Sequence, residues 1–306
     1  MAKVLIATEK PFAPAAVQSI REIVEKAGFE LALLEKYTDK AQLLDAVKDV
    51  DAMIVRSDKV TAEVIEHAQN LKIVVRAGAG YDNLDLEACT AKGIVAMNTP
   101  GQNSNAVAEL ALGMMVAMAR NNYAGTSGSE LKGKTLGIHA YGNVGKGVAI
   151  AKGFGMKIYA FDPFIDKSVM LNDGVEVVDS VEELYSKCRY ISLHIPANEH
   201  TKQSINYKLL MSMPKGATLV NTARKEVIHE EEMLKVMAER QDFCYISDIA
   251  PDNKEEFAAK FEGRYFFTPK KMGAQTSEAN INAGIAAANQ IVAFINEGDR
   301  TFQVNK

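Results

Sequence analysis

The sequence predicts an α/β protein with two doubly wound, parallel-sheet domains and a cleft between them. Three observations support this fold class. Short apolar runs alternate with amphipathic stretches along most of the chain, a glycine-rich turn separates an apolar run from a stretch of small residues, and 306 residues are enough for two domains.

Composition excludes several functional classes. The chain is 47% apolar and 24% charged, as in ordinary globular proteins, and its net charge is −4. Nucleic-acid binding needs a basic face, so no nucleic-acid partner is expected. The apolar run at the N-terminus is too short for a signal peptide, and the longest apolar stretch, residues 110–119, is too short to span a membrane, so no membrane partner is expected.

The cysteines point to a reducing environment. Cys89, Cys188 and Cys244 lie far apart in the sequence and show neither a disulfide framework nor the spacing of a zinc site. We therefore predict a cytoplasmic location and no metal.

The first hundred residues are expected to form one small parallel α/β domain. Apolar residues three and four apart, as in Val17, Ile20, Ile23 and Val24, mark its first helix. The predicted strands are residues 4–8, 31–34, 52–55, 73–75 and 94–97. The predicted helices between and after them are residues 15–26, 40–50, 62–69 and 86–92.

A long helix over residues 104–120 follows, with Ser104 or Asn105 as its N-cap. It is apolar on most faces, so we expect it to be buried at a domain or subunit interface. The alanine-rich last helix, residues 277–296, is long enough to carry the chain back to the first domain. We therefore predict a discontinuous first domain, residues 1–98 plus 280–306, around an inserted domain of residues 99–279. A cleft between two domains is a usual place for a small-molecule site.

Residues 135–163 form the unit on which the functional prediction depends. A strand (136–140), a glycine turn, a helix (146–153) and a second strand (158–161) end at an aspartate, which is the order of a Rossmann dinucleotide-binding unit. The free N–H groups of the turn would point at a pyrophosphate. The turn residues concerned are Gly142, Asn143, Val144 and Gly145.

Asp162 lies twenty residues beyond Gly142 and would accept hydrogen bonds from both ribose hydroxyls. Its carboxylate would repel a 2′-phosphate, so the predicted cofactor is NAD rather than NADP. Ala140 occupies the first glycine position of the usual fingerprint, and alanine suits that position only if its φ is negative. Taken alone, the glycines are equally consistent with a turn in some other α/β unit; the flanking strands and Asp162 favour the dinucleotide unit.

The same alternation continues to the end of the inserted domain. Strands are predicted at residues 190–195, 217–221, 243–247 and 266–268, and helices at residues 180–187, 207–213 and 230–239.

Several stretches resemble one family, the D-isomer-specific 2-hydroxyacid dehydrogenases. They are Val55-Arg56-Ser57, the RAGAGYDNLD segment at residues 76–85, MNTP at 97–100, VAEL at 107–110 and NTAR at 221–224. The resemblance extends from about residue 4 to residue 296, and the chain resembles family members that lack a C-terminal regulatory domain. It implies NAD-dependent oxidation of a small 2-hydroxy acid by a homodimer.

The resemblance also implies the substrate-binding residues. A nest of backbone N–H groups would hold the substrate carboxylate. Arg56, Ser57 and Lys59 follow the next strand and resemble a grip for a phosphate group, which suits the fork of a guanidinium, although Lys59 reads equally as a solvated surface lysine. The expected substrate is therefore a phosphorylated 2-hydroxy acid. The remaining matched positions are Gly78, Ala79 and Gly80 in the nest, and Asn103, which reads almost as well as a polar residue at a helix start.

The remaining matches concern cofactor and catalysis. Arg224 matches the arginine that binds the carboxylate and carbonyl of the substrate, although Lys225 and Glu226 stand where the family has two glycines. His194 matches a cofactor-side loop and is a poor candidate for the catalytic base, whereas His139 is more simply a core histidine. The other cofactor positions implied by the resemblance are Pro163, Pro196, Thr201, Thr222, Ala223, Asp248, Gly273 and Ala274.

The chain lacks the family's catalytic histidine and its partner glutamate. Aligning Gly273 and Ala274 places Lys271 where the histidine would be, and Asn253 stands where the glutamate would be. A carboxylate would hold a lysine in its charged form, whereas burial and a nearby cation such as Arg224 would make it a base. Lysine without the glutamate is therefore a consistent set, with Lys271 and Arg224 as the catalytic pair. Lys270 is the alternative base.

Three further hypotheses stay open. In the first, the substrate is an unphosphorylated 2-hydroxy acid, as for a hydroxypyruvate or glyoxylate reductase. In the second, both lysines are solvated and the chain is inactive. In the third, the chain is an NAD-sensing binding protein that shares this fold.

Overall fold

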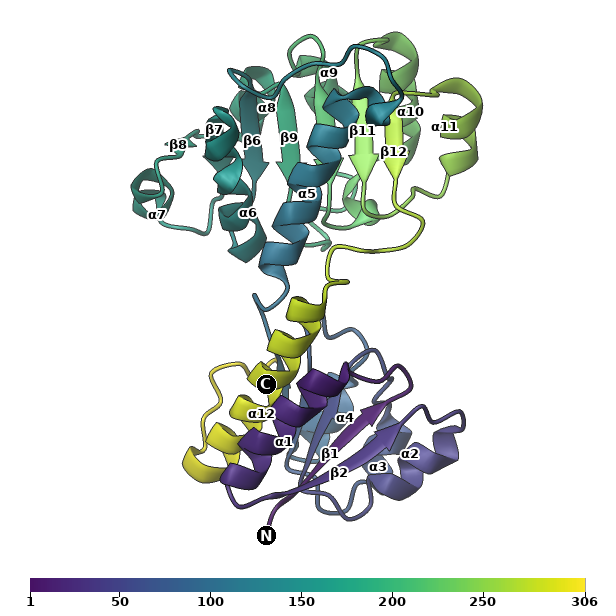
Figure 1. Cartoon of the computed structure of the whole chain (residues 1–306), viewed down its shortest axis with the longest axis vertical. Coiled ribbons are helices and arrows are strands. Elements are labelled where there is room, and N and C mark those ends of the chain that lie inside the picture. The colour runs from purple at the N-terminus through teal and green to yellow at the C-terminus, as the bar shows by residue number, and fades with distance from the viewer. Residues whose placement is uncertain (306) are drawn as a thin grey trace. The chain divides into compact units, whose positions relative to one another are not determined.

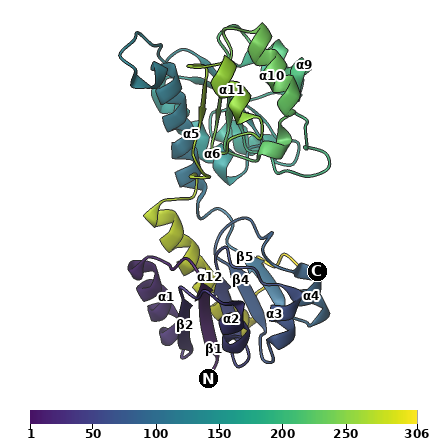
Figure 2. The same ribbon diagram turned by 90° about the vertical axis from the view of Figure 1, so that its right-hand side faces the viewer.

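The computed structural model describes residues 1–305 and divides into two compact units (Figures 1 and 2). Unit 1 contains Met1–Asn103 and the chain from Gln275 onward, and unit 2 contains Ser104–Ala274. Each unit is a parallel sheet with helices packed on it, so the predicted fold class of two doubly wound domains is confirmed. The sequence places the domain boundaries after residue 98 and before residue 280, a few residues from the divisions between these units. The cleft between the domains stays a prediction.

Unit 1 is built on a five-stranded sheet with the order β2-β1-β3-β4-β5. The order reverses between β1 and β3, which makes the carboxyl ends of these strands the expected ligand-binding edge. The strands are β1 (Lys3–Thr8), β2 (Glu30–Glu35), β3 (Ala52–Val55), β4 (Ile73–Arg76) and β5 (Val95–Asn98). The helices are α1 (Pro14–Lys26), α2 (Lys40–Ala46), α3 (Ala62–His67), α4 (Leu86–Ala91) and α12 (Ser277–Glu297).

Close packing of two helices fixes the position of α12 in unit 1. Helix α1 buries Ala16, Ile20 and Val24, and α12 buries alanines and Gly284 on the face toward it. A Cβ atom on Gly284 would lie 2.9 Å from Cδ1 of Ile20. The small side chains therefore let α12 approach α1 closely, which holds the N-terminal turn of α12 in a defined place (Figure 1).

Unit 2 is built on a seven-stranded sheet with the order β12-β11-β10-β9-β6-β7-β8. The reversal lies between β6 and β9, where Ile138 pairs with Ser192 and His139 pairs with Leu193. The strands are β6 (Thr135–His139), β7 (Lys157–Phe161), β8 (Glu176–Val177), β9 (Tyr190–Leu193), β10 (Thr218–Asn221), β11 (Cys244–Ser247) and β12 (Tyr265–Phe267).

Helices cover both faces of this sheet, and successive strand residues enter different hydrophobic clusters. Leu219 packs into one cluster and Val220 into the other, as alternation along a strand requires. The helices are α5 (Ser104–Ala119), α6 (Asn143–Val148), α7 (Lys167–Asn172), α8 (Val181–Lys187), α9 (Tyr207–Ser212), α10 (Glu230–Glu239) and α11 (Lys254–Lys260), with short 3₁₀ turns at 121–123, 149–154 and 225–227. Among the helices of the described chain, none is long and apolar enough to span a bilayer.

Sequence patterns missed three short elements and misplaced one helix start. Strand β8 has only two residues, and α7 and α11 have six and seven, too short for a period to be recognised. Helix α6 begins at Asn143, three residues before the predicted start, and tightens into a 3₁₀ turn from Ala149. The start of α6 therefore lies directly in the glycine turn.

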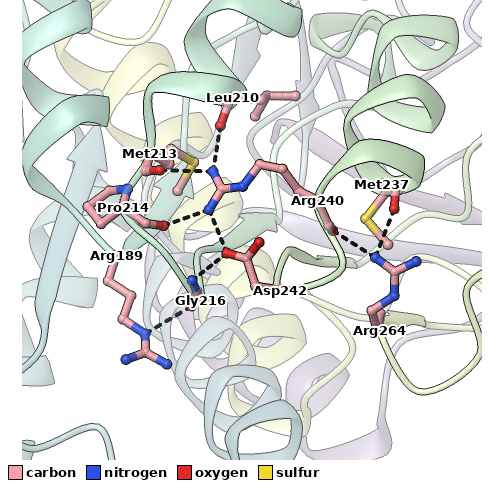
Figure 3. Close-up of polar contacts among 9 residues, drawn as sticks. All are labelled: Arg189, Leu210, Met213, Pro214, Gly216, Met237, Arg240, Asp242 and Arg264. Atoms are coloured by element: carbon pink, nitrogen blue, oxygen red, sulfur yellow. Dashed lines mark hydrogen bonds and ion pairs between the residues drawn. The ribbon is translucent and has the colours of Figure 1, made fainter.

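A partly buried arginine holds together the edge of unit 2 opposite to the carboxyl ends of its strands (Figure 3). Arg240 follows α10 and donates to the carbonyl oxygens of Leu210, Met213 and Pro214 at the end of α9. Its guanidinium also pairs with the Asp242 carboxylate at 2.7 Å. Asp242 accepts a further bond from the Gly216 N–H, so one ion pair satisfies a helix end and the start of β10.

This network predicts an acid-sensitive contribution to stability. The hydrogen bond from Arg240 lowers the pKa of Asp242 to about 2, below the value of about 3.9 in the unfolded chain. The carboxylate therefore stabilises the fold above pH 4, and this contribution is lost as the pH falls toward 2. We expect Asp242→Asn to lower the free energy of unfolding of unit 2 at pH 7 by about 1 kcal/mol, after allowing for solvent screening.

The measurement is urea unfolding followed by circular dichroism at pH 7 and pH 2.5. The difference between wild type and Asp242→Asn should shrink at the lower pH. Glu256→Gln, at an exposed ion pair with Lys260 on α11, is the control and should change stability by less than about 0.5 kcal/mol. A wild-type to Asp242→Asn difference that is equal at both pH values would contradict the assignment.

Candidate active site

The glycine turn connects β6 to the N-terminus of α6 at the reversal of sheet order. Gly142 is the N-cap of α6, with φ −73°, and Lys146 is the first residue whose N–H bonds back to its carbonyl oxygen. The N–H groups of Asn143, Val144 and Gly145 therefore have no helical acceptor and are free for an anion. A Cβ on Gly145 would lie 2.2 Å from the Ala140 carbonyl oxygen, whereas a Cβ on Gly142 would meet no protein atom within 4 Å. Gly145 is thus required by packing, and Gly142 leaves open space in front of the turn.

Ala140 does not meet the condition stated for an alanine at this position, which was a negative φ. Ala140 has φ +78°, in the left-handed region where a Cβ is disfavoured. Its N–H donates to the Phe161 carbonyl oxygen at 3.0 Å, which continues the pairing of β6 with β7 beyond the strand end. The turn keeps the backbone path that glycine usually provides and accepts the strain of alanine there.

Asp162 lies at the carboxyl end of β7, next to the turn. One carboxylate oxygen accepts from the Tyr141 N–H at 2.7 Å and the other from the Phe164 N–H at 2.8 Å. Each oxygen keeps lone pairs for further donors, such as two vicinal hydroxyls. Asp162 and Pro163 line a cavity of about 590 Å³, a volume in the range of small-molecule sites.

Two histidines lie beneath this edge and are neutral. Burial lowers the pKa of His139 to about 4, and its ring lies 3.3 Å from the Tyr185 hydroxyl, as expected for a core histidine. Burial, with the nearby His139, lowers the pKa of His194 to about 3. His194 follows β9 and bonds to Ser192 at 2.9 Å. A group that is neutral and this weakly basic is a poor proton acceptor, which agrees with the expectation from the sequence.

Thr201 and Pro196 have a local structural role in the loop after β9. The Thr201 hydroxyl donates to the Pro196 carbonyl oxygen and accepts from the Asn198 N–H at 2.9 Å. The two residues therefore close the loop, and their predicted contact with a cofactor stays a prediction.

The loop after β10 carries Arg224 and is shaped by an asparagine. The Asn221 side chain accepts from the Ala223 N–H at 3.0 Å and donates to the Arg224 carbonyl oxygen at 2.9 Å. Arg224 is partly exposed and its guanidinium donates to the Ala223 carbonyl oxygen. Within residues 1–305, the buried hydroxyl of Thr222 has no hydrogen-bond partner. A buried polar atom without a partner is unusual and fits a site that a ligand completes.

Asp248 organises the loop that contains both candidate lysines. Its carboxylate is 1% exposed and accepts from the Thr268 hydroxyl at 3.0 Å and from the N–H groups of Met272 and Gly273, each at 2.8 Å. A Cβ on Gly273 would lie 3.0 Å from Asp248 and 3.1 Å from Val107, so a larger residue would press on both side chains. Both oxygens of Asp248 are engaged in this way, and its predicted contact with a cofactor amide stays a prediction.

Lys270 and Lys271 are both exposed within this loop, so unit 2 alone does not provide the burial expected of a lysine that acts as a base. Ala274 follows the loop at the end of unit 2. The loop follows β12, while Arg224 follows β10 two strands away in the same sheet. Parallel strands end at one edge, so Lys271 and Arg224 lie on the same edge as the glycine turn.

Asn253 occupies the position of the missing glutamate, and its side chain links two loops. Its amide nitrogen donates to the Glu230 carbonyl oxygen at 3.3 Å. The Glu230 carboxylate accepts from the Asp252 N–H, and Asp252 pairs with Lys225. Lys225, which stands where the family has glycine, therefore links the Arg224 loop to the loop after β11.

In unit 1, Arg56 lies at the reversal of sheet order. Its guanidinium donates to the carbonyl oxygens of Lys10 and Pro11, each at 3.0 Å, and to the Asn280 side chain at 2.6 Å. It also lies over the Phe12 ring, 5.2 Å from its centre. Burial lowers the pKa of Arg56, an effect that Asp58 opposes. Ser57 and Lys59 are exposed beside it.

The segment Gly78–Gly80 presents unpaired backbone donors at the end of β4. The Gly78 carbonyl oxygen accepts from the Thr99 N–H, and the Ala79 carbonyl oxygen accepts from the Asn98 side chain. Across the described residues, none of the three N–H groups donates to a protein acceptor. Gly78 has φ +149°, and a Cβ there would collide with the Arg76 guanidinium. Three unpaired N–H groups in sequence form a concavity suited to an anion. Asn103 is partly exposed at the last position of the first segment of unit 1.

The sequence analysis missed a buried carboxylate that fixes the Arg56 loop. Asp58 is 4% exposed and accepts from the Glu9 N–H at 2.7 Å and the Tyr37 hydroxyl at 2.9 Å. Asn83 bonds to the Asp58 carbonyl oxygen at 2.7 Å. Its position directly after the matched motif Val55-Arg56-Ser57 could have drawn attention to Asp58. Its partners could not be identified in the same way, because they come from distant segments of the chain.

Comparison with known proteins gives one family. The model of "D-isomer specific 2-hydroxyacid dehydrogenase, catalytic domain" matches residues 4–305. A D-3-phosphoglycerate dehydrogenase of Methanocaldococcus jannaschii is 37% identical over 88% of the chain, and the chain spans only 54% of that relative. A hydroxypyruvate reductase of Thermotoga maritima is 36% identical over 86% of the chain and 90% of its own length.

A solved structure of an NAD⁺-bound 3-phosphoglycerate dehydrogenase from Entamoeba histolytica is 51% identical. It has a TM-score of 0.87, and the match covers 100% of this chain and 99% of that one.

The two glycines of the turn predict opposite outcomes on substitution. Gly145→Ala should lower the free energy of unfolding by about 2–4 kcal/mol, because its Cβ would collide with the backbone at Ala140. Gly142→Ala should fold with unchanged stability but bind NADH at least tenfold more weakly, because its Cβ fills the open space in front of the turn.

Thermal melting and NADH fluorescence titration measure the two effects. Gly153→Ala, at an exposed position with free space, is the matched control and should change neither quantity. Unchanged NADH affinity in Gly142→Ala would exclude this turn as the dinucleotide site.

Proposed function

The chain belongs to the D-isomer specific 2-hydroxyacid dehydrogenases, and we propose that it catalyses the NAD-dependent oxidation of D-3-phosphoglycerate to 3-phosphohydroxypyruvate. This reaction would be the first step of serine biosynthesis. The observation that carries the proposal is the edge of unit 2, where a dinucleotide turn, Arg224 and the Lys271 loop follow strands of one sheet. The similarity to phosphoglycerate dehydrogenases along nearly the whole chain supports it.

The residues of unit 2 fit NAD. The N–H groups of Asn143, Val144 and Gly145 would hold its pyrophosphate, and Asp162 would bind the adenosine ribose. The unpartnered hydroxyl of Thr222 lies at the end of β10, where the other half of a dinucleotide would lie. In this site NAD⁺ would supply the hydride acceptor for oxidation at C2 of the substrate.

Lys271 and Arg224 perform the chemistry of the chain itself. The neutral amine of Lys271 takes the proton of the C2 hydroxyl as oxidation proceeds, and its ammonium returns that proton in the reverse reaction. Arg224 binds the substrate carboxylate and polarises the C2 oxygen, so that its charge stabilises the developing oxyanion. Asn253 in place of the family's glutamate removes the one carboxylate that the family pairs with its base and that would favour the charged form of a lysine.

Unit 1 supplies the groups that recognise an acid with two anionic ends. The unpaired N–H groups of Gly78, Ala79 and Gly80 suit a carboxylate. Arg56, with Ser57 and Lys59 beside it, suits a phosphate. A substrate with a carboxylate and a phosphate is therefore favoured over an unphosphorylated acid.

The assembly and location belong to the same proposal. Two large apolar side chains of unit 2, Ile150 and Phe154, are 58% and 45% exposed, which supports a homodimer formed through this unit. Cys89 and Cys188 are free, and burial raises their pKa values to about 11 and 12. Unreactive free thiols suit a reducing, cytoplasmic location.

The nearest rival is a hydroxypyruvate or glyoxylate reductase, which the relative from Thermotoga maritima supports. That function needs no phosphate grip, and Arg56 is the feature that argues against it. The rival from another class, an NAD-sensing binding protein, would bind NADH and turn over no acid.

The two adjacent lysines provide a direct test of the base. Lys271→Ala should lower kcat about 10²- to 10⁴-fold, the usual size of a general acid–base contribution. Lys270→Ala, with the same loss of charge one residue away, should keep kcat within about threefold. Both variants should bind NADH normally, because neither lysine holds the pyrophosphate. The assay is NADH formation at saturating substrate, and loss of turnover in Lys270→Ala alone would show that the alignment is wrong.

Arg56 separates the proposed substrate from the rival ones. Wild type should oxidise D-3-phosphoglycerate with a higher kcat/KM than D-glycerate. Arg56→Ala should raise KM for the phosphorylated acid about 10- to 100-fold, the value of a charge-assisted contact to phosphate. Arg21→Ala, at an exposed pair with Glu25, is the matched control and should leave KM unchanged. A wild type that prefers unphosphorylated acids, with Arg56→Ala affecting both equally, would favour the reductase.

A further inference from the structure

Asn280, in the first turn of α12, makes a shorter hydrogen bond to the Arg56 guanidinium than either main-chain acceptor does. Its Oδ1 atom accepts from Nη2 of Arg56 at 2.6 Å, although the two residues are 224 positions apart. The other acceptors of the guanidinium are main-chain carbonyl oxygens, at 3.0 Å. Neither the glycine turn nor the NTAR motif accounts for this asparagine.

The amide of Asn280 is held in one orientation. Its nitrogen donates to the Thr276 carbonyl oxygen at 2.8 Å, so the oxygen faces Arg56. Thr276 is the N-cap of α12, and its hydroxyl accepts from the Ala279 N–H at 3.1 Å. The close packing of Gly284 on Ile20 fixes the helix behind this turn. The acceptor is therefore rigid, and it sets the plane of the guanidinium.

The neutrality of the acceptor matters as much as its position. Among the described residues, the groups that hold the Arg56 guanidinium are uncharged: two carbonyl oxygens, one amide and the Phe12 ring. Across residues 1–305, no carboxylate lies within ion-pair distance of it. Arg56 is thus oriented by neutral groups, and no carboxylate partner offsets its positive charge. An arginine that binds an anion requires this condition.

We propose that Asn280 is a positioning residue for the substrate phosphate, which orients Arg56 through a neutral acceptor and thereby sets the preference for a phosphorylated acid. The inference rests on the proposed function, in which Arg56 binds phosphate. A carboxylate at the same position would pair with Arg56 and compete with the phosphate. An asparagine aims the guanidinium and leaves its charge for the substrate.

The test is Asn280→Asp, read as the ratio of kcat/KM for D-3-phosphoglycerate to that for D-glycerate. The ratio should fall at least tenfold, through KM for the phosphorylated acid rather than through kcat. Asn282→Asp is the matched control, because it adds the same charge to the same helix at an exposed position. It should change the ratio by less than twofold.

A double-mutant cycle with Arg56→Ala shows whether the effect passes through the arginine. In the Arg56→Ala background, Asn280→Asp should have no further effect on the ratio. An equal fall of the ratio in both backgrounds, an Asn282→Asp effect as large as that of Asn280→Asp, or a change in kcat alone would overturn the inference.

Wild-type kinetics separate this inference from the proposed function. A wild type that does not oxidise D-3-phosphoglycerate contradicts the function itself. A wild type that prefers the phosphorylated acid, combined with an unchanged ratio in Asn280→Asp, overturns only the role of Asn280.

Discussion

The candidate site depends on the hydrogen bonds that the carboxylate of Asp248 accepts. It is almost completely buried, and it accepts hydrogen bonds from Thr268, Met272 and Gly273, on both sides of the two lysines. Charge-assisted bonds of this kind are among the stronger ones in a protein. One buried anion thus fixes the path of the loop that carries Lys271, while Asn221 fixes the path of the loop that carries Arg224.

The groups proposed to bind the substrate are positive or are hydrogen-bond donors, as an anionic substrate requires. Arg56 is an example. Its guanidinium donates to the neutral amide of Asn280, and its backbone N–H donates to the carboxylate of Asp58. The charge of Arg56 is therefore available to the substrate. The absence of a glutamate at position 253 acts differently, because it removes a carboxylate that would favour the charged form of a neighbouring lysine.

Much of the fold was predictable because periodicity and turn residues report local structure. Both parallel sheets and most helices follow from apolar spacing, and the turn at Gly142 follows from its motif. The positive φ of Ala140 does not follow from its residue type, because it accompanies a hydrogen bond from its N–H to Phe161, twenty-one residues away. Asp58 and Asn280 were missed because their roles depend on contacts with residues such as Tyr37 and Arg56, which local patterns do not contain. The roles of the matched site residues stay predictions that the geometry supports.

The central claim is that an amine takes the place of the family's imidazole at the reacting oxygen. The most direct measurement is a crystal structure with NADH and a substrate analogue that carries both a carboxylate and a phosphate. We expect Nζ of Lys271 and the guanidinium of Arg224 within hydrogen-bond distance of the C2 oxygen. A complex in which another group contacts that oxygen, with Lys270 and Lys271 both turned to solvent, would contradict the account.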